Sequence, residues 1–204
     1  MPAVRWDDAD WRAWRPEQTA RRLEGLDVPW CVAAGWAIDL FVGYERREHE
    51  DIEIAAPADA FPQIQSLLGD LDFYAVGDGE VAAVVESPER FAVTHQTWGL
   101  DRTTFEWRID VFREPSADCE WVCRRDEQIR LPYDELIEHT TDRIPYVRPE
   151  VALLFKAKAA RSKDEADLRD VLPLLDSPRR ALLHDWIALV HPGHDWLGLV
   201  SGER

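Results

Sequence analysis

Two acidic residues, Asp51 and Glu53, alternate with isoleucines in the segment Asp51-Ile52-Glu53-Ile54. If this segment is a strand, both carboxylates lie on one face of it and the isoleucines pack behind. Such a pair offers hard oxygen ligands to a divalent cation, and Mg²⁺ prefers a few carboxylates together with phosphate oxygens and water. An alternating polar face is equally typical of a strand that is solvated on one side. The pair alone is therefore weak evidence for a metal site.

Features upstream of the pair favour the binding of a metal–nucleotide complex. Gly35 lies between a predicted strand and a predicted helix, where a missing side chain lets phosphate approach backbone N–H groups at the positive end of the helix. Arg46, Arg47 and His49 place hydrogen-bond donors next to the acidic pair, as phosphate binding requires. We therefore expect Gly35, Arg46 and His49 to contact the nucleotide.

A third carboxylate, Asp110, stands among apolar residues in the predicted strand at residues 105–112. A carboxylate in a central strand is costly to bury unless it is paired or bound to a metal. The sequence thus predicts a catalytic and metal-binding set of Asp51, Glu53 and Asp110. It leaves open whether Asp110 binds the cation or takes the proton of an attacking hydroxyl.

Lys156 and Lys158 are further candidates for contacts with the phosphates of a nucleotide. They lie two residues apart in a predicted helix and therefore cannot face the same way. We expect one of them to reach the nucleotide and the other to lie on the surface.

The order of predicted elements indicates an α/β or α+β fold, in which a mixed sheet flanked by helices is followed by a C-terminal helical bundle. Strand-like and helical segments alternate up to about residue 141, and helical patterns dominate beyond it. This change predicts a catalytic domain at residues 1–141 and a helical region at residues 142–204. The expected helices are residues 16–26, 36–42, 57–68, 149–160, 163–175 and 179–190. The expected strands are residues 30–34, 51–55, 73–76, 81–86, 91–96 and 105–112.

The motifs of this chain resemble those of the aminoglycoside and lincosamide nucleotidyltransferases, within the DNA polymerase β-like nucleotidyltransferase superfamily. The resemblance is most specific in the string WCVAAGWAIDLFVG at residues 30–43 and in RREHEDIEI at residues 46–54, and it continues more loosely through residues 107–115 and 148–175. Two positions differ from the usual pattern. Ala34 precedes Gly35 where the family has two glycines or glycine and serine, and Glu53 stands where Asp is commoner.

The resemblance implies a Mg²⁺-dependent nucleotidyltransferase that uses ATP as its donor and transfers AMP to a hydroxyl group with release of pyrophosphate. By position, Asp51 and Glu53 match the acidic pair of the family motif, and Asp110 matches the third carboxylate. The family also suggests a small, cationic acceptor such as an aminoglycoside antibiotic, and hence a role in antibiotic resistance.

Composition bounds these expectations. The 204 residues carry a formal net charge of −16, with 46% hydrophobic and 31% charged residues, as in an ordinary globular protein. An acidic chain repels polyanions, so we expect no nucleic-acid partner, although a local basic patch would escape this count. No apolar run approaches the roughly 20 residues that span a bilayer, and residues 1–10 lack an export signal, so we expect a cytoplasmic protein. The three cysteines indicate neither disulfides nor a zinc site.

Two alternatives remain open at this point. An enzyme of the same fold could modify a tRNA or a protein, and a module that keeps the fold without activity could bind a nucleotide or a partner. The sequence does not predict the oligomeric state.

Overall fold

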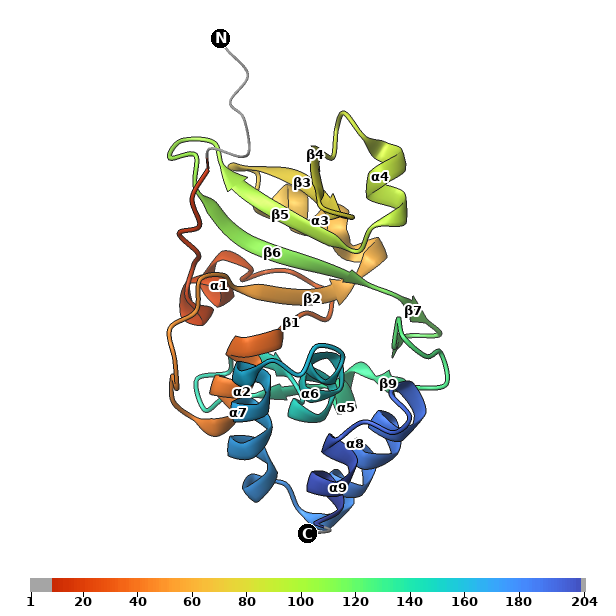
Figure 1. Ribbon diagram of the computed structural model, residues 1–204. Helices are drawn as coiled ribbons and strands as arrows, with labels where there is room; N and C mark the ends of the chain where they lie inside the picture. The colour runs from red at the N-terminus through yellow and green to blue at the C-terminus, as the bar shows by residue number, and fades with distance from the viewer. Residues whose placement is uncertain (1–8, 203–204) are drawn as a thin grey trace.

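The computed structural model describes residues 9–202, and its elements form a mixed eight-stranded sheet, a small three-stranded sheet and helices packed against them (Figure 1). The strands are, in chain order, β1 Cys31–Val32, β2 Glu53–Pro57, β3 Leu71–Gly77, β4 Glu80–Ala83, β5 Gln96–Asp101, β6 Trp107–Glu114, β7 Ser116–Ala117, β8 Glu120–Val122, β9 Arg130–Pro132, β10 Ile137–His139 and β11 Pro145–Val147. The α-helices are α1 Pro16–Arg22, α2 Ala34–Val42, α3 Phe61–Leu67, α4 Pro88–Val93, α5 Tyr133–Leu136, α6 Pro149–Ala157, α7 Ser162–Val171, α8 Ser177–Val190 and α9 Trp196–Ser201. Short 3₁₀ turns at Ala58–Ala60 and Leu172–Leu174 precede α3 and follow α7.

The large sheet has the strand order β10-β11-β1-β2-β6-β5-β3-β4, and β7-β8-β9 form the small sheet. β2 pairs with β6 and β1 with β11 in parallel, whereas the other neighbours are antiparallel. The predicted fold class, a mixed sheet flanked by helices, is confirmed.

Alternation along β2 and β6 separates a core face from a polar face. Ile54, Ile109 and Val111 are fully buried in the core, as is Ile52 directly before β2. Glu53 and Asp110 lie directly opposite each other in the register of these two strands. Because side chains on paired positions project from the same face of a sheet, the fold brings these two carboxylates together.

Helix α2 follows β1 after one residue and is apolar along most of its length, which places it against the sheet. It ends at Gly43 in the left-handed conformation, with φ 94°, which glycine adopts readily at the end of a helix. Its first residue, Ala34, also has a positive φ, 50°, although it carries a Cβ. An alanine in that region is strained by roughly 1 kcal/mol relative to glycine.

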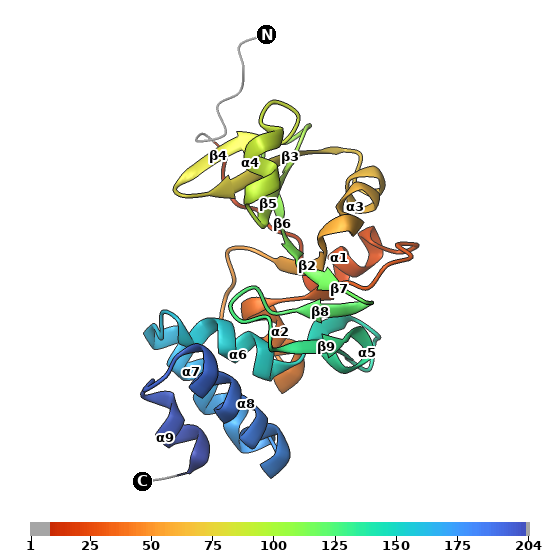
Figure 2. The same cartoon turned by 90° about the vertical axis from the view of Figure 1, so that its right-hand side faces the viewer.

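Helices α6, α7, α8 and α9 gather on one side of the molecule, away from α3 and α4 (Figure 2). Three of the four were predicted within a few residues; α9 was not. Strand β11 lies beyond residue 141 and pairs with β1, so the large sheet continues into the predicted C-terminal region. The division into two domains stays a prediction.

The sequence prediction is wrong at residues 91–96. Helix α4 covers Pro88–Val93, and β5 begins only at Gln96. The carbonyl groups of Phe91 and Thr94 accept hydrogen bonds of 2.7 Å from the buried Arg113 side chain. This contact with β6 holds the end of α4 and is not visible in local sequence. The short strands β7 to β11 were also missed.

All three cysteines are free thiols, as predicted. Among residues 9–202, no helix is long and apolar enough to cross a membrane. The prediction about an export signal at residues 1–10 falls mostly outside the described residues.

Candidate active site

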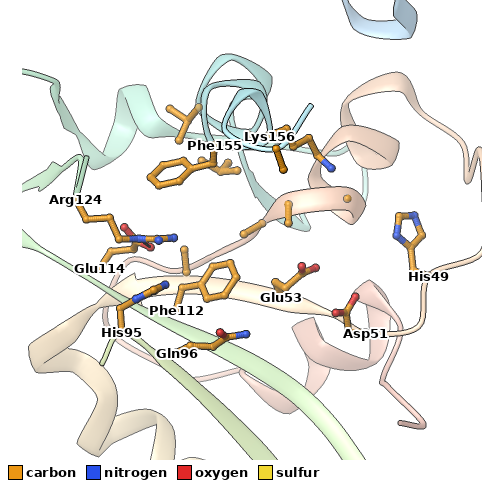
Figure 3. A pocket seen from close by; sticks show the side chains of 18 of the residues that line it. His49, Asp51, Glu53, His95, Gln96, Phe112, Glu114, Arg124, Phe155 and Lys156 are labelled. Carbon is orange, nitrogen blue, oxygen red and sulfur yellow. Dashed lines mark hydrogen bonds and ion pairs between the residues drawn. The ribbon is translucent and has the colours of Figure 1, made fainter. Parts of the chain in front are cut away.

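A cavity of about 590 Å³ lies between the polar face of the sheet and helix α6 (Figure 3). Its lining comes from the start of α2, the loop before β2, strands β2, β5, β6 and β8, and α6. We call one part of it the carboxylate end, defined by Gly35, Arg47, Asp51, Glu53 and Lys156. We call the other part the aromatic end, defined by Phe112, Glu114, Trp121, Arg124 and Phe155.

Asp51 and Glu53 both line the carboxylate end, and their side chains point into the cavity from the strand side while Lys156 points into it from α6 (Figure 3). The backbone carbonyl of Asp51 accepts a hydrogen bond of 3.1 Å from the indole of Trp36. The backbone carbonyl of Glu53 accepts a 2.8 Å bond from Ala33 N–H. The backbone of both residues is thus held by the Trp36 side chain of α2 and by Ala33, the residue between β1 and α2.

Asp110 is 2% exposed and does not line the cavity. Gln96, which does line it, donates its side-chain amide to Asp110 Oδ2. The other oxygen, Oδ1, is buried without a hydrogen-bond partner. A buried acceptor without a partner is uncommon and costly, so Asp110 carries free ligand capacity directly beside Glu53.

Burial raises the pKa of Glu53 to about 8, and the charges of Asp51 and Asp110 add to this effect. Burial likewise raises the pKa of Asp110 to about 8 against the opposing effects of the Gln96 and Trp98 side chains, and the charge of Asp51 adds a smaller contribution in the same direction as burial. A bound cation favours the ionised form of carboxylates that are crowded together and otherwise remain protonated. The donor set therefore fits a divalent metal.

Within residues 9–202, no three His, Cys, Asp or Glu side chains already stand close enough together to hold an ion. Asp51 and Glu53 face the cavity while Asp110 lies behind Gln96. Gathering all three around one cation therefore requires side-chain rotation at Asp110 and Gln96.

Gly35 lies one residue inside α2, and the space beside its Cα is filled. A Cβ at this position would lie 2.5 Å from Arg47 Nη2 and 2.8 Å from His49 Cε1. The close packing of two side chains is thus one reason for a glycine here, and the contact of Gly35 with phosphate stays a prediction. Arg47 Nε is buried without a partner, which leaves a donor at the positive start of the helix for an anion.

His49 lines the cavity, stacks on Trp36 with ring centroids 4.3 Å apart, and donates from Nε2 to Asp39 Oδ2 at 2.7 Å. Asp39 is a buried carboxylate on α2. Although burial opposes its ionisation, the hydrogen bond from His49 and the charge of Arg46 hold the pKa of Asp39 below its usual value. Sequence reasoning passed over Asp39, yet a carboxylate in an apolar helix is itself a signal of a buried partner.

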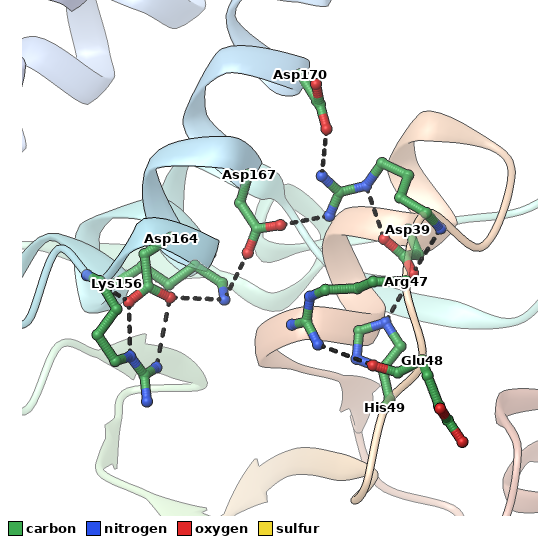
Figure 4. A network of polar contacts seen from close by, with 10 residues as sticks. Asp39, Arg47, Glu48, His49, Lys156, Asp164, Asp167 and Asp170 are labelled. Carbon is green, nitrogen blue, oxygen red and sulfur yellow. Dashed lines mark hydrogen bonds and ion pairs between the residues drawn. The ribbon is translucent and has the colours of Figure 1, made fainter.

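Arg46 does not reach the cavity. Its guanidinium is 7% exposed and contacts Asp39 at 2.7 Å, Asp167 at 2.5 Å and Asp170 at 2.8 Å (Figure 4). These acids neutralise the charge and bind the loop before β2 to α7. Arg46 thus belongs to an ion network outside the cavity lining, where the structure provides no support for the expected contact with phosphate.

Lys156 lines the cavity, and its ammonium group lies 3.3 Å from Asp164 and 2.8 Å from Asp167 (Figure 4). Asp167 thus contacts both Arg46 and Lys156. Lys158 is exposed and lies outside the cavity lining. Two further cations, Arg161 and Lys163, line the same end and were not predicted.

The aromatic end was almost entirely missed from sequence. Trp121 is buried and also lines the cavity. Arg124 and Phe155 come from a loop and from α6, and only their meeting in space reveals them. No local motif marks either residue.

Comparison with solved structures places this fold among antibiotic adenylyltransferases. The lincosamide antibiotic adenylyltransferase LnuA with lincomycin bound has a TM-score of 0.53 at 18% identity, over 76% of this chain and 92% of that one. ANT(2'')-Ia in complex with adenylyl-2''-tobramycin has a TM-score of 0.56 at 13% identity, over 85% of this chain and 95% of that one. At such identities the likeness shows the fold. A search of curated protein sequences finds no match.

A family model supplies the assignment that structural likeness alone does not. The model of aminoglycoside-2''-adenylyltransferase matches residues 17–119, which contain β1, α2, β2 and β6 and therefore all three carboxylates. The chain belongs to the aminoglycoside-2''-adenylyltransferase family and is a nucleotidyltransferase.

Proposed function

We propose that this enzyme transfers AMP from Mg²⁺-bound ATP to a hydroxyl group of a small acceptor and releases pyrophosphate. The observation that carries the proposal is the pairing of Glu53 with Asp110 on adjacent strands, with Asp51 two residues before Glu53 on the cavity side. Family membership supports a nucleotide donor.

Asp51 and Glu53 would hold the cation from the cavity, and Asp110 Oδ1, which lacks a partner, would complete the set from behind. The bound cation would neutralise charge on the phosphates and favour ionisation of the attacking hydroxyl. Ionisation of Glu53 and Asp110 is unfavourable without it, since burial raises the pKa of each to about 8.

Four cationic side chains line the same cavity as the carboxylates: Arg47, Lys156, Arg161 and Lys163. The start of α2 adds the positive end of a helix dipole. Together they suit the four negative charges of a triphosphate. We therefore assign the pyrophosphate portion of the donor to these residues, with Lys156 fixed by Asp164 and Asp167.

The acceptor belongs to the class of small hydroxyl compounds. The related structures contain lincomycin and an adenylylated tobramycin, so an antibiotic hydroxyl is the first acceptor to test. A polyanionic acceptor such as tRNA is disfavoured by the net charge of −16.

The test uses the full chain with Mg²⁺, ATP labelled at the α-phosphate, and a panel of aminoglycosides, lincosamides and nucleosides. We expect label on one acceptor, with stoichiometric pyrophosphate release, and loss of both in Asp51→Asn. Asp59→Asn is the matched control because Asp59 is exposed and lies outside the cavity lining. Unchanged nucleotide affinity in Asp51→Asn and Glu53→Gln, with and without Mg²⁺, would contradict the metal-site assignment.

A further inference from the structure

Asp110 lies between a carboxylate and a tryptophan on the polar face of the large sheet. In the register of the strands it pairs with Glu53 of β2 on one side and with Trp98 of β5 on the other. Gln96 stands two residues before Trp98, opposite Phe112, and therefore projects from the same face. A long side chain at such a diagonal position reaches its neighbour on the adjacent strand. The fold thus places two residues of β5 that carry N–H donors beside one carboxylate.

The side-chain amide of Gln96 holds one oxygen of Asp110 and leaves the other free. Its Nε2 donates to Asp110 Oδ2, whereas Oδ1 is buried and has no hydrogen-bond partner within residues 9–202. Gln96 itself lines the strand side of the cavity (Figure 3). Carboxylates that bind metal ions in proteins are usually hydrogen-bonded in turn to outer groups, which orient them. Gln96 therefore holds Asp110 as such an outer group holds a metal ligand.

Trp98 carries a second donor, and no acceptor in the described part of the chain uses it. Its indole Nε1 is buried without a hydrogen-bond partner among residues 9–202. Edge-to-face contacts fix the ring, whose centroid lies 5.3 Å from that of Trp11 and 5.4 Å from that of Trp107. Burial raises the pKa of Asp110, and the side chains of Gln96 and Trp98 both oppose this effect. The indole N–H thus lies close enough to favour a charged carboxylate.

The free N–H of Trp98 and the free Oδ1 of Asp110 belong to directly paired residues. A buried donor or acceptor without a partner costs stability, and an apolar pair at these positions would avoid that cost. The arrangement has a use if the carboxylate rotates, because binding one cation together with Asp51 and Glu53 requires such a rotation. Two donors can hold whichever oxygen turns away from the ion.

We propose that Gln96 and Trp98 are positioning residues that orient Asp110 toward the cation, each by donating an N–H to the carboxylate oxygen that does not bind the ion. The inference rests on the proposed function for the presence of the cation. Charge-assisted hydrogen bonds from both donors favour the charged carboxylate that binds a metal ion. Loss of either donor should therefore weaken metal binding although neither residue is a metal ligand.

Binding of Mn²⁺, followed by electron paramagnetic resonance, tests this without turnover. The full chain is titrated with Mn²⁺ in the presence of α,β-methylene ATP, and a titration of the nucleotide alone gives its own share of the ion. Gln96→Met removes the donor and keeps the length of the side chain, so we expect the Kd for Mn²⁺ to rise about tenfold. Trp98→Phe removes the N–H and keeps an aromatic ring, and the Kd should rise about threefold.

Each variant has a matched control. Gln128→Met makes the same change at a residue that is exposed and outside the cavity lining. Trp11→Phe removes an indole that packs on Trp98, and no hydrogen bond or ion pair within residues 9–202 joins Trp11 to Asp110. Both controls should bind Mn²⁺ within twofold of the wild type. A loss in Trp11→Phe as large as that in Trp98→Phe would show that packing is responsible and overturns the role of Trp98.

Asp110→Asn separates positioning from a structural role. If the two donors act through the carboxylate, Gln96→Met and Trp98→Phe should each change the Kd for Mn²⁺ less than twofold once Asp110 is replaced. Equal losses with and without the carboxylate overturn the inference, because the two side chains then act independently of Asp110.

The same titrations distinguish this inference from the proposed function. Mn²⁺ binding that Asp110→Asn does not weaken removes Asp110 from the metal site and overturns both. Mn²⁺ binding that requires Asp110 but is unchanged in Gln96→Met and Trp98→Phe overturns only the positioning role.

Discussion

The two ends of the cavity are built by different means. The carboxylate end crowds like charges on paired strands, and opposing cations on α6 and the loop after it are held by the acids of α7. The aromatic end neutralises its one carboxylate internally and presents rings and a guanidinium. The first arrangement suits the binding of a metal–nucleotide complex. The difference predicts that substitutions at one end leave binding at the other end largely unchanged.

Glu53→Gln should give the largest difference between the effects on turnover and on acceptor binding. Removing the charge of a carboxylate proposed to bind the cation should lower kcat by on the order of 10³-fold. The affinity for the acceptor should change less than threefold, because no hydrogen bond or ion pair within residues 9–202 joins Glu53 to the aromatic end. Steady-state kinetics and acceptor titration measure the two effects. Equal losses in both would show that the ends are not independent.

The ion network behind the carboxylate end should be sensitive to Asp167→Asn. This carboxylate is 1% exposed and contacts both Arg46 and Lys156. Removing one partner leaves buried cations incompletely paired, which costs about 3 kcal/mol of unfolding free energy. Denaturant unfolding measures this loss.

Asp170→Asn is the matched control for that variant. Asp170 pairs with the same Arg46 at 2.8 Å, but its side chain is 44% exposed. An exposed pair contributes about 0.5 kcal/mol. A loss of unfolding free energy as large as that of Asp167→Asn would show that burial does not determine how much an ion pair of this network stabilises the fold.

Ionisable groups beside the two ends should make the stability of the fold depend on pH in opposite directions. The pKa of Asp110 is raised to about 8 in the folded protein, so without metal its contribution favours folding at low pH and is lost as pH rises toward 8. The pKa of His95 is lowered to about 4, so its contribution is present above the usual histidine pKa and is lost as pH falls toward 4. Stability should therefore peak at intermediate pH.

Thermal unfolding of two variants separates the loss of stability at high pH from the loss at low pH. Asp110→Asn should stabilise the metal-free protein by about 1–3 kcal/mol at pH 8 and change it little at pH 4. His95→Gln should reduce only the loss of stability that occurs as pH falls toward 4. Mg²⁺ should stabilise the wild type at pH 8 and not Asp110→Asn. A stabilisation by Mg²⁺ that is equal in both would remove Asp110 from the metal site.

Sequence reasoning identified the carboxylate end because its information is local. Alternation places Asp51 and Glu53 on one face, and an isolated carboxylate in an apolar strand marks Asp110. The contacts of Arg46 could not be predicted, since its partners Asp167 and Asp170 lie 121 and 124 residues away in the chain. A basic residue beside an acidic pair has the same local pattern whether it binds phosphate or a distant helix.

The aromatic end and helix α4 also depend on contacts between residues that are distant in the sequence, which local patterns do not predict. Phe112, Arg124 and Phe155 come from a strand, a loop and a helix, so no spacing predicts that they meet. Residues 91–96 look like a strand in isolation, although Pro88 at the start of α4 was a local signal for a helix. Tertiary hydrogen bonds from Arg113 then fix its end.

The smallest expected effect is at Ala34, which opens α2 with φ 50°. Ala34→Gly should stabilise the protein by about 0.5–1 kcal/mol, because strain in the left-handed region is relieved, less the greater chain entropy of glycine in the unfolded state. Denaturant unfolding measures the change, and Ala37→Gly within the same helix is the contrasting control, expected to destabilise. Since the start of α2 lies at the carboxylate end, Ala34→Gly should alter nucleotide affinity and leave acceptor affinity unchanged. A change at the aromatic end would show that the backbone of α2 couples the two.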